Sequence, residues 1–268
     1  MGVGKGVVFG EGKSLIAIPT TYAGSEMTPV FGTTDRAERR KTVRRDDAVL
    51  PKLVIYDPEL TLDLSPLLTA STAMNAMAHC VEACYAPKVN PLAPPVALEG
   101  IRRIVRSLPL CITNGRNLDA REDLLTGAYL AGFSIGNATM ALHHGVCHVL
   151  GGRTGVAHGV LNAIMLPHVM QFNADAVPDA MDAIARNFPP RFMQLSLPRL
   201  RGRVGVGAPD AVAALVATLP VPHRLRDAGV PEAVLDSVAA EAATNSAVQA
   251  NPKPVTEADL RDLLRKAW

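Results

Sequence analysis

Histidines gather in one short part of this sequence. The stretch from Leu142 to Gly152 reads LHHGVCHVLGG, and a further histidine, His158, follows it closely. His144 and His148 are four residues apart, so a helix would place both on one face. Converging imidazoles either bind a transition metal or move protons near neutral pH, whereas a lone histidine is more often a packed helix residue. Three histidines at this spacing favour a functional site over packing alone.

The chain must turn after this helix if the third imidazole is to join the first two. Gly151 and Gly152 are expected to end the helix, because glycine readily adopts the left-handed conformation that terminates helices. A Gly- and Ala-containing loop would then return His158 to the side of the pair.

A second group of polar side chains lies on an earlier Ala- and Met-rich stretch, residues 69–85. Asn75 and His79 are four residues apart there, and Glu82 follows one turn later. The spacing again predicts one helix face. This face is therefore a candidate partner for the histidine helix.

Helices are expected to position both groups, since helical periodicity dominates after Pro66. Pro167 is expected to kink or break one of these helices. Thr256 with Asp259 has the pattern of a capping box that opens a last helix reaching Trp268. The predicted helices cover 69–85, 98–108, 121–140, the histidine stretch, 162–172, 211–218, 232–243 and 257–268.

The first 65 residues have a different character. Residues 14–19 and 53–56 are short apolar runs that predict buried strands, and 31–34 with 42–45 predict a hairpin. The loop from Thr20 to Glu26 is rich in hydroxyl groups and glycine, so it is either an anion-binding loop or an ordinary polar turn. We expect an α/β piece over 1–65 and an all-helical domain over 66–268. Residues 187–209, rich in proline and arginine, are expected to form an atypical insert or loop.

Composition narrows the function classes. The chain has 268 residues, of which 48% are hydrophobic and 19% charged, and its formal net charge is +2. This balance predicts a globular protein and no nucleic-acid partner. The four cysteines form no CxxC pair, which fits a cytoplasmic location. Because no apolar run is long enough to span a bilayer, no membrane partner is expected.

Four motifs in one order resemble the maleylacetate reductases, a branch of the iron-containing (group III) alcohol dehydrogenase family. They are Ile18–Pro29 (IPTTYAGSEMTP), Lys41 with Leu50-Pro51 and Tyr56–Leu60, Met74–Ala83 (MNAMAHCVEA), and His143–Gly152 with His158-Gly159 and Leu166-Pro167. The resemblance implies a dehydroquinate synthase-like fold, mostly α in this chain, and a homodimer.

The resemblance also implies a reaction and its residues. A maleylacetate reductase uses NADH or NADPH to reduce the carbon–carbon double bond of maleylacetate, a small dicarboxylate, to 3-oxoadipate in aromatic-compound degradation. His148 and His158 are expected to transfer protons and stabilise the oxyanion, while His79 and His144 orient the substrate. By resemblance, the residues that contact the nucleotide are Thr20, Thr21, Ser25 and Lys41.

A metal site is the alternative use of the same positions. The family's iron is held by an aspartate and three histidines, and His79, His144 and His158 fall on the histidine positions. Asn75 stands at the aspartate position, and a neutral amide is a poorer ligand for Fe²⁺ or Zn²⁺ than a carboxylate. The resemblance therefore favours the metal-free reductase branch. A metal-dependent alcohol dehydrogenase that uses these four residues remains the other reading.

One departure from the family concerns the start of the sequence. Family members begin with a dinucleotide-binding domain, and its Gly-Gly-Gly-Ser phosphate motif has no counterpart here. We therefore expect an N-terminally truncated chain, which alone would bind nicotinamide cofactor weakly or not at all. It would expose apolar strand faces near Ile16 and Val54. An inactive remnant or a mis-started reading frame is the competing explanation.

Overall fold

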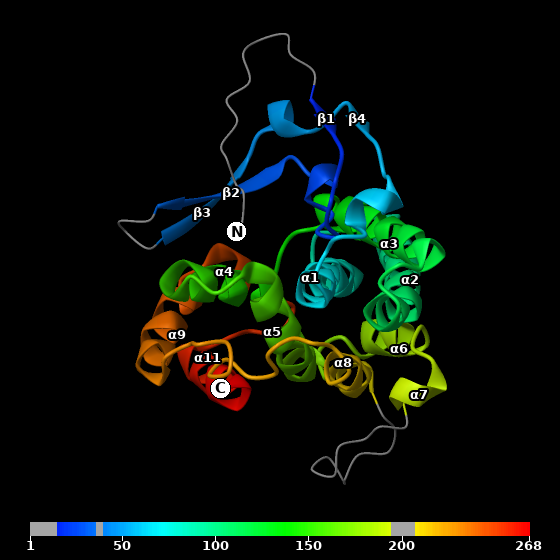
Figure 1. Ribbon diagram of the computed structural model, residues 1–268. Coiled ribbons are helices and arrows are strands. Elements are labelled where there is room, and N and C mark those ends of the chain that lie inside the picture. The colour runs from blue at the N-terminus through cyan, green and yellow to red at the C-terminus, as the bar shows by residue number, and fades with distance from the viewer. Residues whose placement is uncertain (1–14, 36–39, 194–206) are drawn as a thin grey trace.

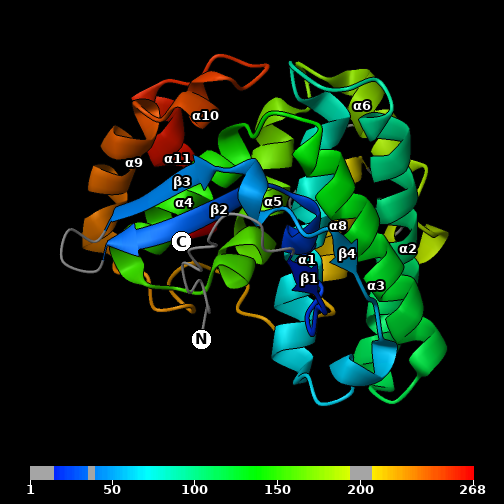
Figure 2. The ribbon, with the colours of Figure 1, turned by 90° about the horizontal axis from the view of Figure 1, so that it is seen from above.

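The computed structural model describes residues 15–35, 40–193 and 207–268. A small β portion lies above a larger helical body (Figure 1). The predicted hairpin is confirmed: β2 (Val30–Asp35) and β3 (Arg40–Arg45) pair in antiparallel fashion. The hairpin lies across the helix that carries the dense histidine stretch, as the view from above shows (Figure 2).

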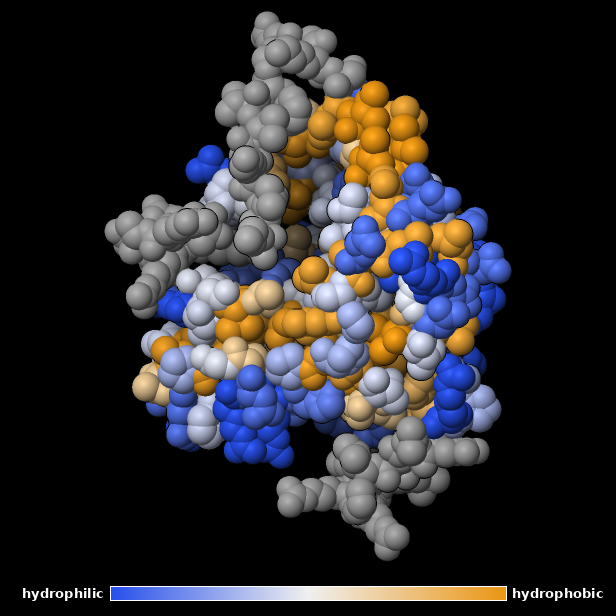
Figure 3. Space-filling model, in the orientation of Figure 1, coloured by the Kyte–Doolittle hydropathy of each residue, from blue (hydrophilic) through white to orange (hydrophobic). Residues whose placement is uncertain are grey.

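The two predicted buried strands are shorter and more exposed than expected. β1 (Ile16–Ala17) and β4 (Leu53–Val54) pair in parallel as a sheet of two strands. Ile16 is 56% exposed and Leu53 is 51% exposed, so burial on this face was predicted wrongly. A sheet of only two short strands is too small to bury side chains on both of its faces. The exposure expected for apolar side chains near Ile16 is found, and apolar residues gather at the top of the molecule (Figure 3).

Helices are the other secondary-structure elements of the described chain. The long ones after residue 65 appear where periodicity predicted them, although their ends differ by several residues. Short 3-10 helices, η1 (Ser25–Met27), η2 (Asp47–Val49), η3 (Pro58–Thr61) and η5 (Glu232–Val234), occupy some of the connections. The α-helices are α1 (Pro66–Tyr85), α2 (Ala93–Thr113), α3 (Leu118–Gly136), α4 (Leu142–Thr154), α5 (His158–Asn173), α6 (Pro178–Ala185), α7 (Pro190–Met193), α8 (Ala208–Val216), α9 (Leu235–Ala243), α10 (Ser246–Gln249) and α11 (Glu257–Ala267).

Two apolar clusters hold the helices together. One cluster forms among α1, α2, α3, α6 and α8, and the other joins α4 and α5 to α9 and α11. Helix α1 is buried along most of its length because its alanines let α2, α3 and α5 approach from several sides. Since α1 also contacts α4, the two polar groups singled out in the sequence lie on packed neighbouring helices.

Three expected helix ends can be compared with the structure. Gly151 and Gly152 do not end α4, which runs on to Thr154 and ends at Gly155, whose φ of 72° lies in the left-handed region. Helix α5 continues through Pro167 instead of breaking there. The capping box at Thr256 is confirmed.

The segment 187–209 lies only partly within the described chain. Its described ends contain the short helix α7 and the start of α8. Residues 194–206 lie outside the described ranges. Among the helices of the described ranges, none has the length and apolar character needed to cross a membrane.

Candidate active site

The structure brings the four predicted catalytic histidines together. His79 comes from α1, His144 and His148 from α4, and His158 from the first position of α5. Ring centroids are 4.9 Å apart for His79 and His144, 6.1 Å for His144 and His148, and 5.1 Å for His148 and His158. His144 is 1% exposed, whereas His148 and His158 are half-buried. The last two are therefore the members a substrate can reach most readily.

Glu82 of α1 anchors the start of the histidine helix. Its carboxylate accepts hydrogen bonds from the backbone N–H groups of Ala141 (3.1 Å) and His143 (2.8 Å), and it lies 2.7 Å from Nδ1 of His144. A negative charge at a helix N-terminus is stabilising because the first N–H groups have no partners within the helix. Burial alone would raise the pKa of Glu82, but the nearby His144 and these hydrogen bonds lower it overall. Glu82 is therefore an ionised, fully buried anchor.

This contact also decides which nitrogen of His144 carries a proton. An ionised carboxylate only accepts hydrogen bonds, so Nδ1 of His144 must be the donor to Glu82. Nε2 of His144 has no hydrogen-bond partner among the described residues. That nitrogen can accept a hydrogen bond when the ring is neutral and donate one when it is protonated.

Asn75 takes part in a different set of contacts from the one its family position suggests. Its side-chain Nδ2 donates to the carbonyl oxygen of Ala23 at 3.1 Å, and its Oδ1 accepts from Nδ2 of Asn162 at 2.7 Å. Oδ1 of Asn162 lies 2.7 Å from Nε2 of His143. These contacts connect the loop that follows β1 to helices α1, α5 and α4.

The loop that follows β1 also makes hydrogen bonds to η3, α3 and α1 through Tyr22. The Tyr22 hydroxyl donates to Thr61 at 2.9 Å and accepts from the buried Arg121 of α3 at 2.8 Å. The backbone N–H of Tyr22 donates to Thr72 of α1. Hydroxyl and guanidinium contacts of this kind fix a loop in one conformation because each buried polar group has a partner.

Three of the predicted cofactor residues lie on this loop and are at least partly exposed. Thr20 and Ser25 are exposed and Thr21 is half-buried, so their side chains can meet a ligand. Lys41 belongs to β3 above α4, but its side chain lies outside what the structure describes. The loop and the histidine cluster are thus neighbours, joined through Asn75.

Burial controls the charge of two of the clustered histidines. The pKa of His79 lies well below its ordinary value because burial disfavours the charged ring and the other histidines repel it. Burial, reinforced by His144, lowers the pKa of His143 to about 4. Both rings are therefore neutral near pH 7 and serve as hydrogen-bonding or packing groups there.

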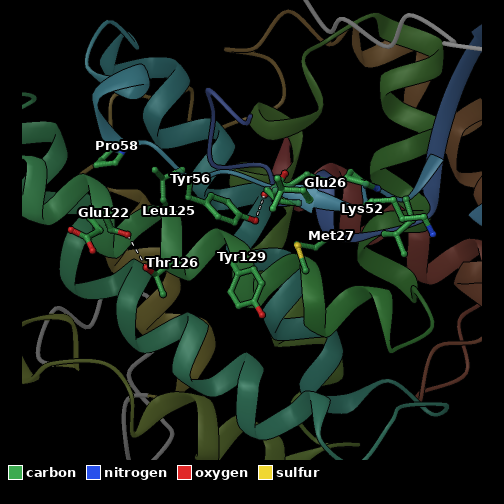
Figure 4. A pocket seen from close by; sticks show the side chains of 13 residues that line it. Glu26, Met27, Lys52, Tyr56, Pro58, Glu122, Leu125, Thr126 and Tyr129 are labelled. Carbon is green, nitrogen blue, oxygen red and sulfur yellow. Dashed lines mark hydrogen bonds between the residues drawn. The ribbon is translucent and has the colours of Figure 1, made fainter. Parts of the chain in front are cut away.

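A large pocket lies elsewhere on the molecule. It has a volume of about 880 Å³, is lined by Tyr56, Tyr129 and the apolar side chains around β4, and includes none of the histidines. The Tyr56 hydroxyl donates to Glu26 at 2.8 Å on its wall (Figure 4). Burial raises the pKa of the Glu26 carboxyl, with the hydrogen bond from Tyr56 opposing the rise. The histidine cluster holds the converging proton donors and acceptors, so it is the better candidate active site.

Comparison with known protein families shows which family the chain belongs to. The sequence profile for the C-terminal part of the Fe-containing alcohol dehydrogenase family matches residues 69–268, and the iron-containing alcohol dehydrogenase profile matches residues 3–58. The chain belongs to the iron-containing alcohol dehydrogenase family. Maleylacetate reductase 1 of Rhodococcus opacus is 40% identical over 267 residues, which are 100% of this chain and 70% of that protein. The maleylacetate reductase of Burkholderia cepacia is 38% identical with the same coverage.

Solved structures of this family have the same fold. The maleylacetate reductase of Agrobacterium tumefaciens superposes with a TM-score of 0.83 at 36% identity, over 95% of this chain and 67% of that one. The iron-containing alcohol dehydrogenase of Corynebacterium glutamicum gives 0.81 at 34% identity, over 95% and 66%. The expected fold class is therefore confirmed. The division at residue 65 remains a prediction, although α1 begins at Pro66.

The family is named for iron, so the residues at the expected metal-ligand positions can be compared with the arrangement that an iron site needs. The rings of His79 and His144 are stacked with only 19° between their planes. The lone pairs of two nearly parallel rings point along separate planes and do not converge readily on one ion. Oδ1 of Asn75 already accepts from Asn162. In the described ranges, no three His, Cys, Asp or Glu side chains are placed to hold a metal ion. The residues as arranged do not fit a family-type metal site.

Sequence reasoning missed the residues that hold the cluster in place. The sequence pattern indicates Glu82 only through its spacing from His79, and neither Asn162 nor Arg121 is among the predicted site residues. An unpaired acid one turn beyond His79 on an apolar helix was the available signal for Glu82. Asn162 gives a weaker signal, an amide within the apolar run Val160–Leu166 of α5.

Proposed function

We propose that this protein reduces the carbon–carbon double bond of maleylacetate with hydride from NADH or NADPH and forms 3-oxoadipate. Its place would be in the degradation of aromatic compounds. The observation that carries the proposal is similarity to curated maleylacetate reductases at 36–40% identity over the whole chain. The active-site histidines and the hydroxyl-rich loop support it, because they supply the chemistry such a reaction needs.

The reaction requires one hydride and one proton. Hydride from the nicotinamide ring adds to the alkene carbon farther from the ketone, and the electron pair of the double bond moves onto the ketone oxygen as an enolate. A proton then adds to the carbon beside the ketone. Hydrogen-bond donors aimed at the enolate oxygen lower the barrier, and a nearby acid supplies the proton. No other reactant is needed.

The half-buried histidines are placed for these two tasks. We assign proton transfer and contact with the enolate oxygen to His148 and His158, whose rings stack at 5.1 Å. His144, held by Glu82, would donate from Nε2 to a carboxylate or to the ketone oxygen of the substrate when its ring is protonated. His79 is neutral and packs against His144, so it would orient that ring.

Cofactor binding, metal use and assembly complete the proposal. Thr20, Thr21, Ser25 and Lys41 would contact the nucleotide, and the hydroxyl groups would donate to phosphate oxygens. The reaction would proceed without a bound metal, which is supported by the engagement of the Asn75 oxygen with Asn162. A cytoplasmic homodimer is the assembly implied by the resemblance.

The assay follows the loss of NADH or NADPH absorbance after maleylacetate is added, with the cofactor at high concentration because weak cofactor binding is expected of this chain. We expect turnover of maleylacetate, no comparable oxidation of simple alcohols with NAD⁺, and unchanged activity after treatment with a chelator. Alcohol oxidation that requires Fe or Zn would replace the proposal with the metal-dependent dehydrogenase. The metal content of the same sample should be measured in parallel.

A further inference from the structure

A continuous series of hydrogen bonds runs from the backbone of the loop after β1 to the histidine helix. It starts at the Ala23 carbonyl, passes through the side chains of Asn75 and Asn162, and ends at His143. Asn162 is fully buried and Asn75 is 8% exposed. Three contacts of 3.1, 2.7 and 2.7 Å thus join the loop after β1 to helices α1, α5 and α4.

The backbone carbonyl at one end fixes the direction of every bond in the series. The Ala23 oxygen can only accept, so Asn75 must turn its NH₂ group toward it and its oxygen toward Asn162. Asn162 must then donate to that oxygen and present its own oxygen to His143. Because this amide oxygen can only accept, His143 must carry a proton on Nε2. One fixed acceptor thus determines two amide orientations and one histidine tautomer.

Each end of the series meets a part of the proposed active site. At one end, the Ala23 carbonyl lies within the loop of Thr20, Thr21 and Ser25. At the other end, the ring of His143 contacts the ring of His144 edge to face, with centroids 5.2 Å apart. A shift of either amide would therefore disturb both the loop and the ring that packs on His144.

We propose that Asn162 and Asn75 are positioning residues that form an amide relay, which holds the cofactor loop and His143 in one fixed relation. Asn75 stands at the position of the family's metal-binding aspartate, and its NH₂ group instead donates to a backbone carbonyl. Asn162 supplies the donor that keeps the Asn75 oxygen engaged. The functional part of this role rests on the proposed reductase activity, in which the loop contacts the nucleotide.

The first test replaces Asn162 with leucine, which has a similar shape and no polar group. We expect hydrogen exchange in the loop peptide of residues 19–27 to become about tenfold faster, because a buried hydrogen-bond partner is lost. In long-range ¹H–¹⁵N spectra, His143 should change from a single Nε2–H tautomer to a mixture. If the chain reduces maleylacetate, kcat/KM should fall by about tenfold or more.

The matched control is Asn173→Leu in the same helix. Asn173 is also fully buried, and its side chain exchanges amide hydrogen bonds with Asn251 at 3.0 and 2.7 Å. This substitution removes the same chemical group at equal burial but leaves the relay intact. It should lower stability while loop exchange, the His143 tautomer and activity stay as in the wild type.

A second variant separates the two ends of the relay. Asn75→Asp keeps an acceptor for Asn162 but loses the donor to Ala23, so it should speed loop exchange and leave the His143 tautomer unchanged. The relay is overturned if wild-type His143 carries its proton on Nδ1, or if Asn162→Leu matches Asn173→Leu in loop exchange and tautomer. Because neither readout needs turnover, a sample that shows the relay but no reduction of maleylacetate would reject only the reductase assignment.

Discussion

Replacing Glu82 with alanine should lower the free energy of unfolding by about 3–5 kcal/mol, the cost typical of breaking a buried ionic contact. Glu82 is fully buried and binds two backbone N–H groups at the start of α4 as well as Nδ1 of His144. Without the carboxylate, these donors would remain buried with no acceptor. Urea denaturation of the purified variant measures the loss.

A surface ion pair supplies the control for this substitution. Glu241 contacts Arg153 at 2.6 Å, but the two side chains are 31% and 45% exposed. Glu241→Ala should therefore cost less than about 1 kcal/mol. If Glu82→Ala loses no more stability than Glu241→Ala, Glu82 does not anchor α4 and His144. Glu82→Gln, which keeps the size and one acceptor oxygen, should fall between the two.

The stability that Glu82 contributes should depend on pH. Its pKa is lowered in the folded protein, so its contribution is present above the ordinary carboxyl pKa and is lost as pH falls through the lowered folded value. The difference between wild type and Glu82→Ala should therefore be constant near neutral pH and shrink in acid. A difference that grows as the pH falls would contradict an ionised Glu82.

Replacing Gly132 with alanine should destabilise the protein by about 1–3 kcal/mol, the range typical of overpacked sites. Helix α3 touches the backbone of the loop that follows β1 there, and a Cβ on Gly132 would meet the Gly24 carbonyl oxygen and the Met27 side chain. The oxygen would lie 2.1 Å away, so the loop or the helix must move. Urea denaturation measures the stability, and hydrogen exchange of residues 19–27 reports the loop.

Gly151→Ala is the matched control within a helix. A Cβ at Gly151 would find its nearest neighbour, a methyl carbon of Leu161, at an ordinary 3.5 Å. Alanine also favours helix over glycine by about 1 kcal/mol, so this variant should be neutral or slightly stabilised. Equal stability of the Gly132→Ala and Gly151→Ala variants would show that the loop does not depend on close contact with α3.

The sequence predicted the parts of the site that depend on local spacing. The interval between His144 and His148 placed both on one helix face, and the position of His158 after a short loop brought it back to them. These predictions succeeded because helix periodicity is a local property. The hairpin and the capping box at Thr256 were predictable for the same reason.

Contacts between distant segments could not be predicted in this way. Asn75 and Asn162 are 87 residues apart, and no local sequence pattern indicates that their side-chain amides form a hydrogen bond. Glu82 likewise reaches the start of α4 across about sixty residues. The helix end at Gly155 instead of Gly151 shows a different limit, because several glycines can terminate a helix and tertiary packing selects one.

The proposed function depends on hydride transfer from NADH to the double bond of maleylacetate. The most direct measurement supplies NADH carrying deuterium at the transferable position of the nicotinamide ring and analyses the product by mass spectrometry and NMR. We predict 3-oxoadipate with one deuterium, on the carbon separated from the ketone by one carbon. A protein that binds NADH in the same sample but leaves maleylacetate unreduced, or that places deuterium on the former ketone carbon of an alcohol product, would contradict the account.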